Sequence, residues 1–205
     1  MGCVDIISII KDIFLGLSAI AIAVLAWLGL KTWRRELTGK AKFETARNMM
    51  HIGYKLKADL EFVRNPFTYS YESADRTKQS EESDNESQVL DEWHAKSKRL
   101  NPVTESLNKL IELQWESEIL LDEHDVQSIK EAVQSFRESY AELSSAISSY
   151  FDTTYKQARA RQPYKDQEWL KELHHTIYSV GEDDLSKKVD EATEKLSSAL
   201  KQYVK

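Results

Sequence analysis

The sequence predicts an all-α protein in which an N-terminal transmembrane helix continues into a cytoplasmic antiparallel helical bundle. Turn-forming residues are scarce, because the 205-residue chain contains only six Gly and three Pro. One uninterrupted apolar run lies near the N-terminus, and apolar side chains recur every three or four positions through most of the remaining chain. Long helices account for both patterns, whereas a β-rich domain would need more turns.

The apolar run covers residues 13–30, between Lys11-Asp12 and the basic stretch that starts at Lys31. At about 1.5 Å per residue, a helix of this length reaches roughly 27 Å, close to the roughly 30 Å hydrocarbon core of a bilayer. A cleaved signal peptide would have a basic start and a small-residue cleavage site, and this run has neither. We therefore predict a retained transmembrane helix at 13–30, preceded by a short extracytoplasmic N-terminus at 1–12.

The charges beside the run predict its orientation. More Lys and Arg follow the run than precede it, and positively charged flanks stay on the cytoplasmic side. The sequence thus predicts a single-pass protein of the inner (cytoplasmic) membrane, with its N-terminus outside and its C-terminal domain in the cytoplasm. The lipid bilayer is the first expected partner. The expected interfacial anchors at the inner boundary are Trp27, Trp33, Arg34 and Arg35.

Small residues fall on one face of the predicted span, at Gly16, Ala19, Ala23 and Ala26. Helices in lipid associate where small residues let their backbones approach closely. This face predicts a self-associating span and a homo-oligomer. The alternative is a chance register, because Gly and Ala are common in membrane helices.

Two segments lead from the span to the bundle. Residues 31–64 predict a juxtamembrane basic helix that ends before Asn65-Pro66, since the residue before a proline disfavours helical geometry. Residues 65–88 are rich in Ser, Glu and Asp and poor in aliphatic side chains. Such a composition buries too little surface to offset its ordering entropy, so we expect a polar flexible loop.

Residues 89–205 predict the bundle itself. We expect a short helix from Val89 to Arg99 and a new helix starting at Asn101-Pro102, where a cap precedes a proline. Further helices are expected to begin near Asp125, to break at Pro163, to end at Gly181 and to restart at Asp183 or Asp184. The longest apolar series recurs over several heptads and consists of Val126, Ile129, Val133, Phe136, Tyr140, Leu143, Ile147 and Tyr150.

Charge and composition exclude several classes of function. The chain has a net charge of −6, yet Lys and Arg outnumber Asp and Glu in residues 1–65, so the distal part is acidic. An acidic domain repels the phosphate backbone, and nucleic acid is not an expected partner. The glycines are too widely spaced for a phosphate-binding loop, and the nucleophile motif G-x-S-x-G is absent. We therefore expect no cofactor and no catalysis.

Two histidines occur in short pairs with carboxylates. Glu172 and His175 form an E-x-x-H pair, and Asp91 and His94 form a similar D-x-x-H pair. Bundle di-metal sites use two E-x-x-H motifs and two further carboxylates. Because the chain has one true copy, polar side chains on helix surfaces explain these pairs and no metal site is expected.

Arg47 and His51 form the remaining candidate pair. They lie four positions apart on one helix face, where an imidazole could move a proton and a guanidinium could stabilise an oxyanion. The segment resembles the R-x(4–6)-H signature of HEPN ribonucleases, which are also small helical bundles, although only three residues separate the pair here. The resemblance implies RNA cleavage with Arg47 and His51 as the catalytic pair.

Two longer stretches, WRRELTGKAKFETARNMMHIGYKLKADLEFVRNPF and EDDLSKKVDEATEKLSSALKQYV, resemble a group of uncharacterised bacterial proteins. Those proteins have one N-terminal span and a helical cytoplasmic domain. The architecture is also similar to the membrane accessory proteins of type VI CRISPR systems, which look like HEPN-type bundles assembled into membrane pores.

These observations favour a non-enzymatic, membrane-anchored helical protein that binds itself or a cytoplasmic protein partner. The alternative is a homo-oligomeric pore or membrane-disrupting effector in antiviral defence. A HEPN-like ribonuclease is the weaker alternative.

Overall fold

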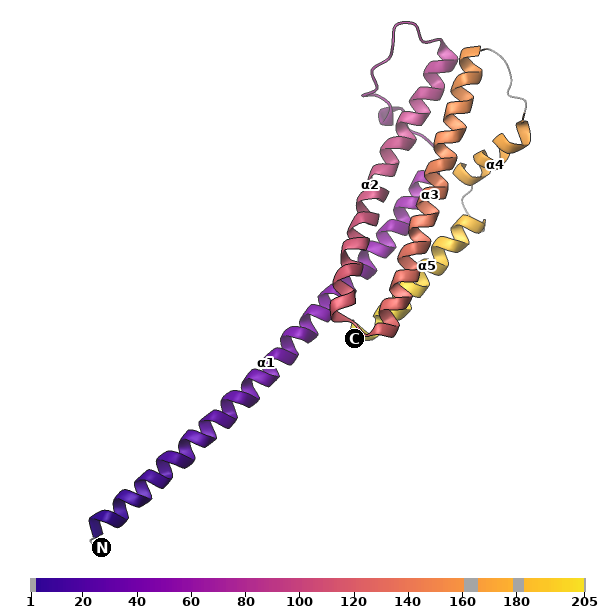
Figure 1. Ribbon diagram of the computed structural model, residues 1–205. Helices are drawn as coiled ribbons and strands as arrows, with labels where there is room; N and C mark the ends of the chain where they lie inside the picture. The colour runs from indigo at the N-terminus through magenta and orange to yellow at the C-terminus, as the bar shows by residue number, and fades with distance from the viewer. Residues whose placement is uncertain (1–2, 161–165, 179–182, 205) are drawn as a thin grey trace. The chain divides into compact units, whose positions relative to one another are not determined.

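The computed structural model describes residues 3–160, 166–178 and 183–204, with side chains from Phe14 onward, and all regular structure in these ranges is helical (Figure 1). The predicted all-α fold is confirmed for this part of the chain. The elements in order are α1 (Cys3–Arg64), the 3₁₀ turn η1 (Ser70–Glu72), α2 (Asp84–Leu120), α3 (Glu123–Ala160), α4 (Gln167–Tyr178), α5 (Asp184–Leu200) and the 3₁₀ turn η2 (Lys201–Tyr203).

The chain forms two compact units, residues 1–44 and residues 45–205, so that α1 contributes to both. The first unit is the N-terminal part of α1. By length and composition, α1 is the one helix among the described residues that could cross a membrane. The second unit is a helical bundle built from the remainder of α1 together with α2 to α5.

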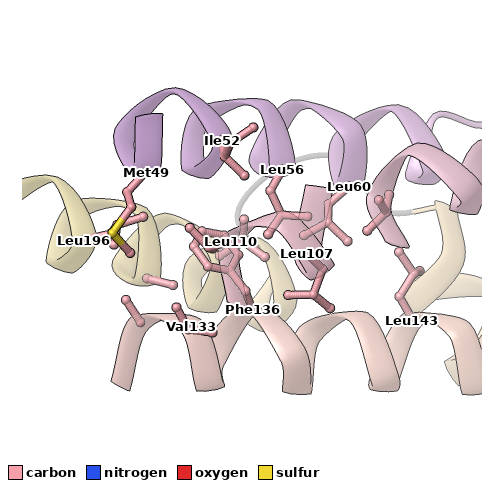
Figure 2. Packing of buried hydrophobic residues seen from close by; sticks show 14 of the residues in the cluster. Met49, Ile52, Leu56, Leu60, Leu107, Leu110, Val133, Phe136, Leu143 and Leu196 are labelled. Carbon is pink, nitrogen blue, oxygen red and sulfur yellow. The ribbon is translucent and has the colours of Figure 1, made fainter. Parts of the chain in front are cut away.

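The core of the bundle lies between α1, α2, α3 and α5 (Figure 2). From α1, Met49 and Leu56 point into the core, which also contains Leu110 of α2 and Phe136 of α3. Each of these four side chains is fully buried, and burial of such a side chain stabilises the fold by roughly 1.5–3 kcal/mol. The heptad series predicted for α3 forms the same core, since six of its members are buried and Tyr140 and Tyr150 are partly buried.

One glycine fixes how closely α1 and α5 approach. A Cβ atom added at Gly53 would lie 2.6 Å from Cδ2 of Leu196, whose side chain is buried. A larger residue at this position therefore requires Leu196 to move. The same helices are joined at the surface by the ion pair between Lys57 and Asp190, with a distance of 2.6 Å from Nζ to Oδ1.

Side-chain caps define several helix ends. At the start of α2, the backbone N–H of Ser83 donates to Glu86 Oε2 at 2.9 Å, and the N–H of Glu86 donates to Ser83 Oγ at 3.4 Å. At the start of α5, Asp183 Oδ1 accepts from the N–H of Ser186 at 2.9 Å, which confirms the predicted cap. The predicted end of the first helix before Asn65-Pro66 is also confirmed, because α1 ends at Arg64.

The predicted break at Asn101-Pro102 is wrong. α2 begins at Asp84 and runs through Pro102 to Leu120 without interruption. A proline inside a helix loses one backbone hydrogen bond and clashes with the preceding turn, at a cost of about 3 kcal/mol. Buried side chains continue on the same face on both sides of Pro102, with Ala95 and Arg99 before it and Val103 and Leu107 after it. Tertiary packing thus overrides the local stop signal.

Smaller differences concern α3 and α4. α3 begins at Glu123 rather than at Asp125, with the backbone N–H groups of Asp125 and Val126 both bonded to the Asp122 carbonyl. α3 ends at Ala160 and α4 begins at Gln167, on either side of the predicted break. Pro163 and Gly181 themselves lie outside the described residues.

Candidate functional site

The apolar part of α1 is fully helical and fully exposed within the chain. Every residue from Phe14 to Leu30 is exposed, including Phe14 at 67% and Leu25 at 68%. The single hydroxyl in this stretch, on Ser18, donates to the Phe14 carbonyl at 2.7 Å, so the helix backbone satisfies it. The stretch therefore presents an apolar surface that the chain itself leaves uncovered.

The small residues predicted to form a packing face share one side of this helix. At about 100° per residue, Gly16, Ala19, Ala23 and Ala26 fall within an arc of roughly 80°. All four are exposed, and nothing lies within 4 Å of a Cβ atom added at Gly16. Asp5 and Asp12 would extend the same face, but no side chain is described there.

The predicted interfacial anchors lie at the C-terminal end of the apolar stretch and directly after it on α1. Trp27 is 61% exposed and Trp33 is 58% exposed, and Arg34 and Arg35 are exposed as well. The Nζ atom of Lys31 lies 5.6 Å from the centroid of the Trp27 ring. Aromatic and basic side chains therefore gather at the C-terminal end of the apolar stretch, which is the end that leads into the bundle.

The structure places the predicted catalytic pair on the bundle surface. Arg47 and His51 are both exposed on α1, and neither makes a hydrogen bond or ion pair to another described residue. Among the described residues, no third group orients the imidazole, which a general base usually requires.

The histidine–carboxylate pairs do not converge. His94 Nε2 lies 3.0 Å from Asp75 Oδ1, whereas Asp91 pairs with Arg76 at 2.5 Å. Glu172 and His175 are both exposed on α4. Among the described residues, no group of three or more His, Cys, Asp and Glu side chains is placed to hold a metal ion.

Three basic residues that the sequence pattern did not single out are buried where α1 ends. Arg64, Lys96 and Arg99, here called the cation cluster, are 4%, 0% and 3% exposed. They come from the end of α1 and the first half of α2. Charged side chains are almost never buried without partners, so each needs a full account of its hydrogen bonds.

Arg99 uses all five of its N–H donors. Two of them form a fork on Glu72, with distances of 2.6 Å from Nε to Oε2 and 2.7 Å from Nη2 to Oε1. The other three reach the backbone carbonyls of Phe62, Asn65 and Phe67 at 2.6–3.2 Å. The Arg99 guanidinium lowers the pKa of Glu72 below its usual range. Arg99 therefore ties α2 to the end of α1 and to the segment that follows it.

Lys96 binds the same helix end. Its Nζ atom donates to the carbonyls of Val63 at 2.7 Å and Asn65 at 2.8 Å, and it lies 4.4 Å from the centroid of the Tyr178 ring. A positive charge is favourable beside the unpaired carbonyls of a helix C-terminus. Burial and the neighbouring charge of Arg99 nevertheless lower the pKa of Lys96 to about 7.

Arg64 joins α1 to α4 and α5. Its Nε atom donates to the Thr176 carbonyl at 3.0 Å, and Nη1 donates to Ser186 Oγ at 2.8 Å and to Asp183 Oδ1 at 3.0 Å. Burial of Asp183 favours its neutral form, but the hydrogen bonds from Arg64 and Ser186 hold its pKa well below the usual range.

The cation cluster can fasten helices, but it offers little for chemistry. Its donors point to carbonyls, carboxylates and the Ser186 hydroxyl of the same chain, which leaves none of the Arg99 donors for a substrate. One sequence signal points to the cluster, since the spacing of Val103, Leu107 and Leu110, extended toward the N-terminus, reaches Arg99 and Lys96.

Comparison of the chain with protein families, with curated proteins and with solved structures finds no match.

Proposed function

We propose that this protein is a single-pass membrane protein without enzymatic activity, in which α1 anchors an antiparallel cytoplasmic bundle that binds itself or another protein. The observation that carries the proposal is the exposure of the apolar stretch from Phe14 to Leu30. Contiguous apolar surface of this extent needs a cover, and exposed patches of this kind mark membrane or protein contacts.

Two other kinds of helix would share this length and composition. A core helix of a soluble protein is mostly buried, whereas no residue from Phe14 to Leu30 is buried. A signal sequence would be followed by a cleavage site, whereas this stretch leads into Lys31, Trp33, Arg34 and Arg35 within one continuous helix. Both comparisons favour a retained span.

The antiparallel arrangement is supported by the connection between α2 and α3. Only Leu121 and Asp122 separate the two helices, and α2 and α3 lie side by side in Figure 1. A connection this short joins neighbouring helices only if the chain reverses its direction. The charge difference between the flanks of the span supports a cytoplasmic location for the bundle.

Alkaline carbonate extraction of cell membranes tests the anchor. We expect the full chain to stay with the lipid pellet and the variant Ile22→Asp to shift toward the supernatant, because a carboxylate at the middle of the span costs roughly 2.5–3.5 kcal/mol. Asp152→Asn, an exposed change in the bundle, is the control and should not alter partitioning. Full release of the unmodified chain by carbonate would overturn the proposal.

A second candidate function is assembly into a homo-oligomer that forms a membrane pore. The contact between copies would be the small-residue face, which consists of Gly16, Ala19, Ala23 and Ala26. The exposure of all four residues and the free space at Gly16 favour it, since another helix could approach there without a clash.

A matched pair of variants tests this second candidate. Ala23→Leu puts a large side chain on the small-residue face, and Ala21→Leu makes the same change about 160° away around the helix. We expect Ala23→Leu to reduce crosslinked oligomers and any membrane depolarisation, and Ala21→Leu to preserve both. If the two variants behave alike, the small-residue face does not mediate assembly.

A further inference from the structure

Three basic residues just after the apolar stretch form one face of α1. Lys31, Arg34 and Arg35, here called the basic face, fall within an arc of about 100° because each residue advances about 100° around the helix. Trp27 lies on the same side, one turn nearer the N-terminus. The neighbouring charges Glu36, Lys40 and Glu44 lie on the other side of the helix.

The two sides of α1 differ in whether their charged side chains form ion pairs. On the far side, Lys40 Nζ lies 3.8 Å from Glu44 Oε1. On the basic face, none of the three side chains forms an ion pair with another described residue, and all three are exposed. The basic face therefore presents uncompensated positive charge, whereas the charge of Lys40 is compensated within the helix.

A surface hollow lies on this face. It has a volume of about 170 Å³ and is lined by Trp27, Leu30, Lys31 and Arg34. Along the helix axis the lining changes from an aromatic and an aliphatic side chain to two cationic ones. A phospholipid changes in the same order, from acyl chain to phosphate, and Trp and Arg side chains suit the boundary between the two.

We propose that this hollow binds the phosphate group of an anionic phospholipid in the cytoplasmic leaflet, with Lys31 and Arg34 as its ligands. The proposal rests on the proposed function, because it requires α1 to cross the bilayer. Lys31 and Arg34 contact the phosphate oxygens, and the Trp27 ring packs on the part of the acyl chains that is nearest the headgroup. Uncompensated charge on the basic face selects anionic lipids over zwitterionic ones.

Quenching of tryptophan fluorescence by brominated lipids measures this selectivity. The full chain is reconstituted into phosphatidylcholine vesicles that contain equal fractions of either brominated phosphatidylglycerol or brominated phosphatidylcholine. Tryptophans within reach of the acyl chains are quenched, and the ratio of the two effects gives the relative affinity for the anionic lipid. We expect a preference of about fivefold for phosphatidylglycerol, consistent with one or two effective basic contacts.

Two variants separate a site from general charge attraction. Lys31→Gln removes a charge from the hollow, and Lys40→Gln makes the same change on the opposite side of the helix. We expect the preference to fall about threefold or more in Lys31→Gln and to persist in Lys40→Gln. An equal fall in both variants, or equal quenching by the two lipids in the unmodified chain, would overturn the proposal.

The same experiment distinguishes the other ways to fail. If neither brominated lipid quenches any tryptophan, α1 is not inserted and the proposed function itself is wrong. If added inorganic phosphate abolishes the preference, the hollow binds a soluble phosphate and the lipid assignment is wrong. Quenching by both lipids without preference removes only the anionic site.

Discussion

The single side chain of Lys96 makes the folding stability of the bundle depend on pH. Its pKa falls to about 7 because it is buried and lies near Arg99, whereas an unfolded chain holds a lysine near 10.4. Between these values the unfolded state binds more protons than the folded state, so folding stability rises with pH. The groups that face Lys96 are Glu72, Glu92, Arg99 and Tyr178, and burial and a hydrogen bond to Glu92 raise the pKa of Tyr178 out of this window.

We therefore expect the stability of the full chain in detergent to increase between about pH 7 and pH 10, with a slope of at most about 1.4 kcal/mol per pH unit. Lys96→Met should remove this slope. Lys98→Met, at an exposed site beside Asp75, is the matched control and should retain it. Thermal unfolding followed by circular dichroism checks the prediction, and an identical slope in Lys96→Met would contradict it.

Arg99 is the residue whose loss should cost the most. Arg99→Ala leaves Glu72 buried without its partner and removes donors from three carbonyls, so we expect a loss of about 3–5 kcal/mol in the free energy of unfolding. Arg99→Lys should recover only part of it, because an ammonium group cannot form the two-pronged contact with Glu72. Chemical denaturation measures both, and a loss below about 1 kcal/mol in Arg99→Ala would contradict the assigned role.

The pair Arg47 and His51 separates a binding protein from a ribonuclease. We expect the purified protein to leave RNA intact, because both side chains are exposed and lack an orienting partner among the described residues. His51→Ala should therefore behave like the unmodified chain in a gel-based cleavage assay. Cleavage that disappears in His51→Ala would instead support the ribonuclease interpretation.

At the scale of single elements, α2 gives the clearest case of tertiary packing overriding a local signal. Pro102 stands inside a helix that runs from Asp84 to Leu120. Because the helix forms despite the proline, Pro102→Ala should stabilise the bundle by about 1–3 kcal/mol. Pro66→Ala, placed after the end of α1, is the control and should change stability little. A destabilised Pro102→Ala variant would indicate that the helix uses the proline in a way the geometry does not explain.

The helices that could be predicted are those whose packing follows from a regular apolar spacing. In α3 that spacing persists through several heptads, and the predicted core positions, from Val126 to Ile147, are buried or partly buried. Helix caps could also be predicted from the local sequence, as at Asp183. The cation cluster could not be predicted, because the carbonyls that bind Lys96 lie more than thirty positions earlier in the chain, at Val63 and Asn65. Only the folded arrangement brings such groups together.

The candidate site was predictable to a similar extent. The apolar stretch and the Trp and Arg residues beside it are continuous in sequence, so composition was sufficient to locate the stretch, and its role as an anchor stays a prediction. The hollow on the basic face depends on which side of the helix each charge occupies and on the pairing of Lys40 with Glu44. Helical geometry predicts which side of the helix each charge occupies, but the pairing of Lys40 with Glu44 is known only from the structure.

At the scale of the whole molecule, the proposed function requires one arrangement of the chain in the membrane. We propose that the apolar stretch of α1 spans the cytoplasmic membrane and that the bundle, with its buried cation cluster, lies inside the cell. The single cysteine of the chain, Cys3, precedes the apolar stretch and provides a direct probe of this arrangement.

Labelling of intact cells with a membrane-impermeant maleimide tests the arrangement most directly. The account predicts that Cys3 is labelled before lysis, whereas Ser80→Cys in a Cys3→Ser background, at an exposed bundle position, is labelled only after lysis. Labelling of the bundle cysteine in intact cells, with Cys3 protected until lysis, would contradict it.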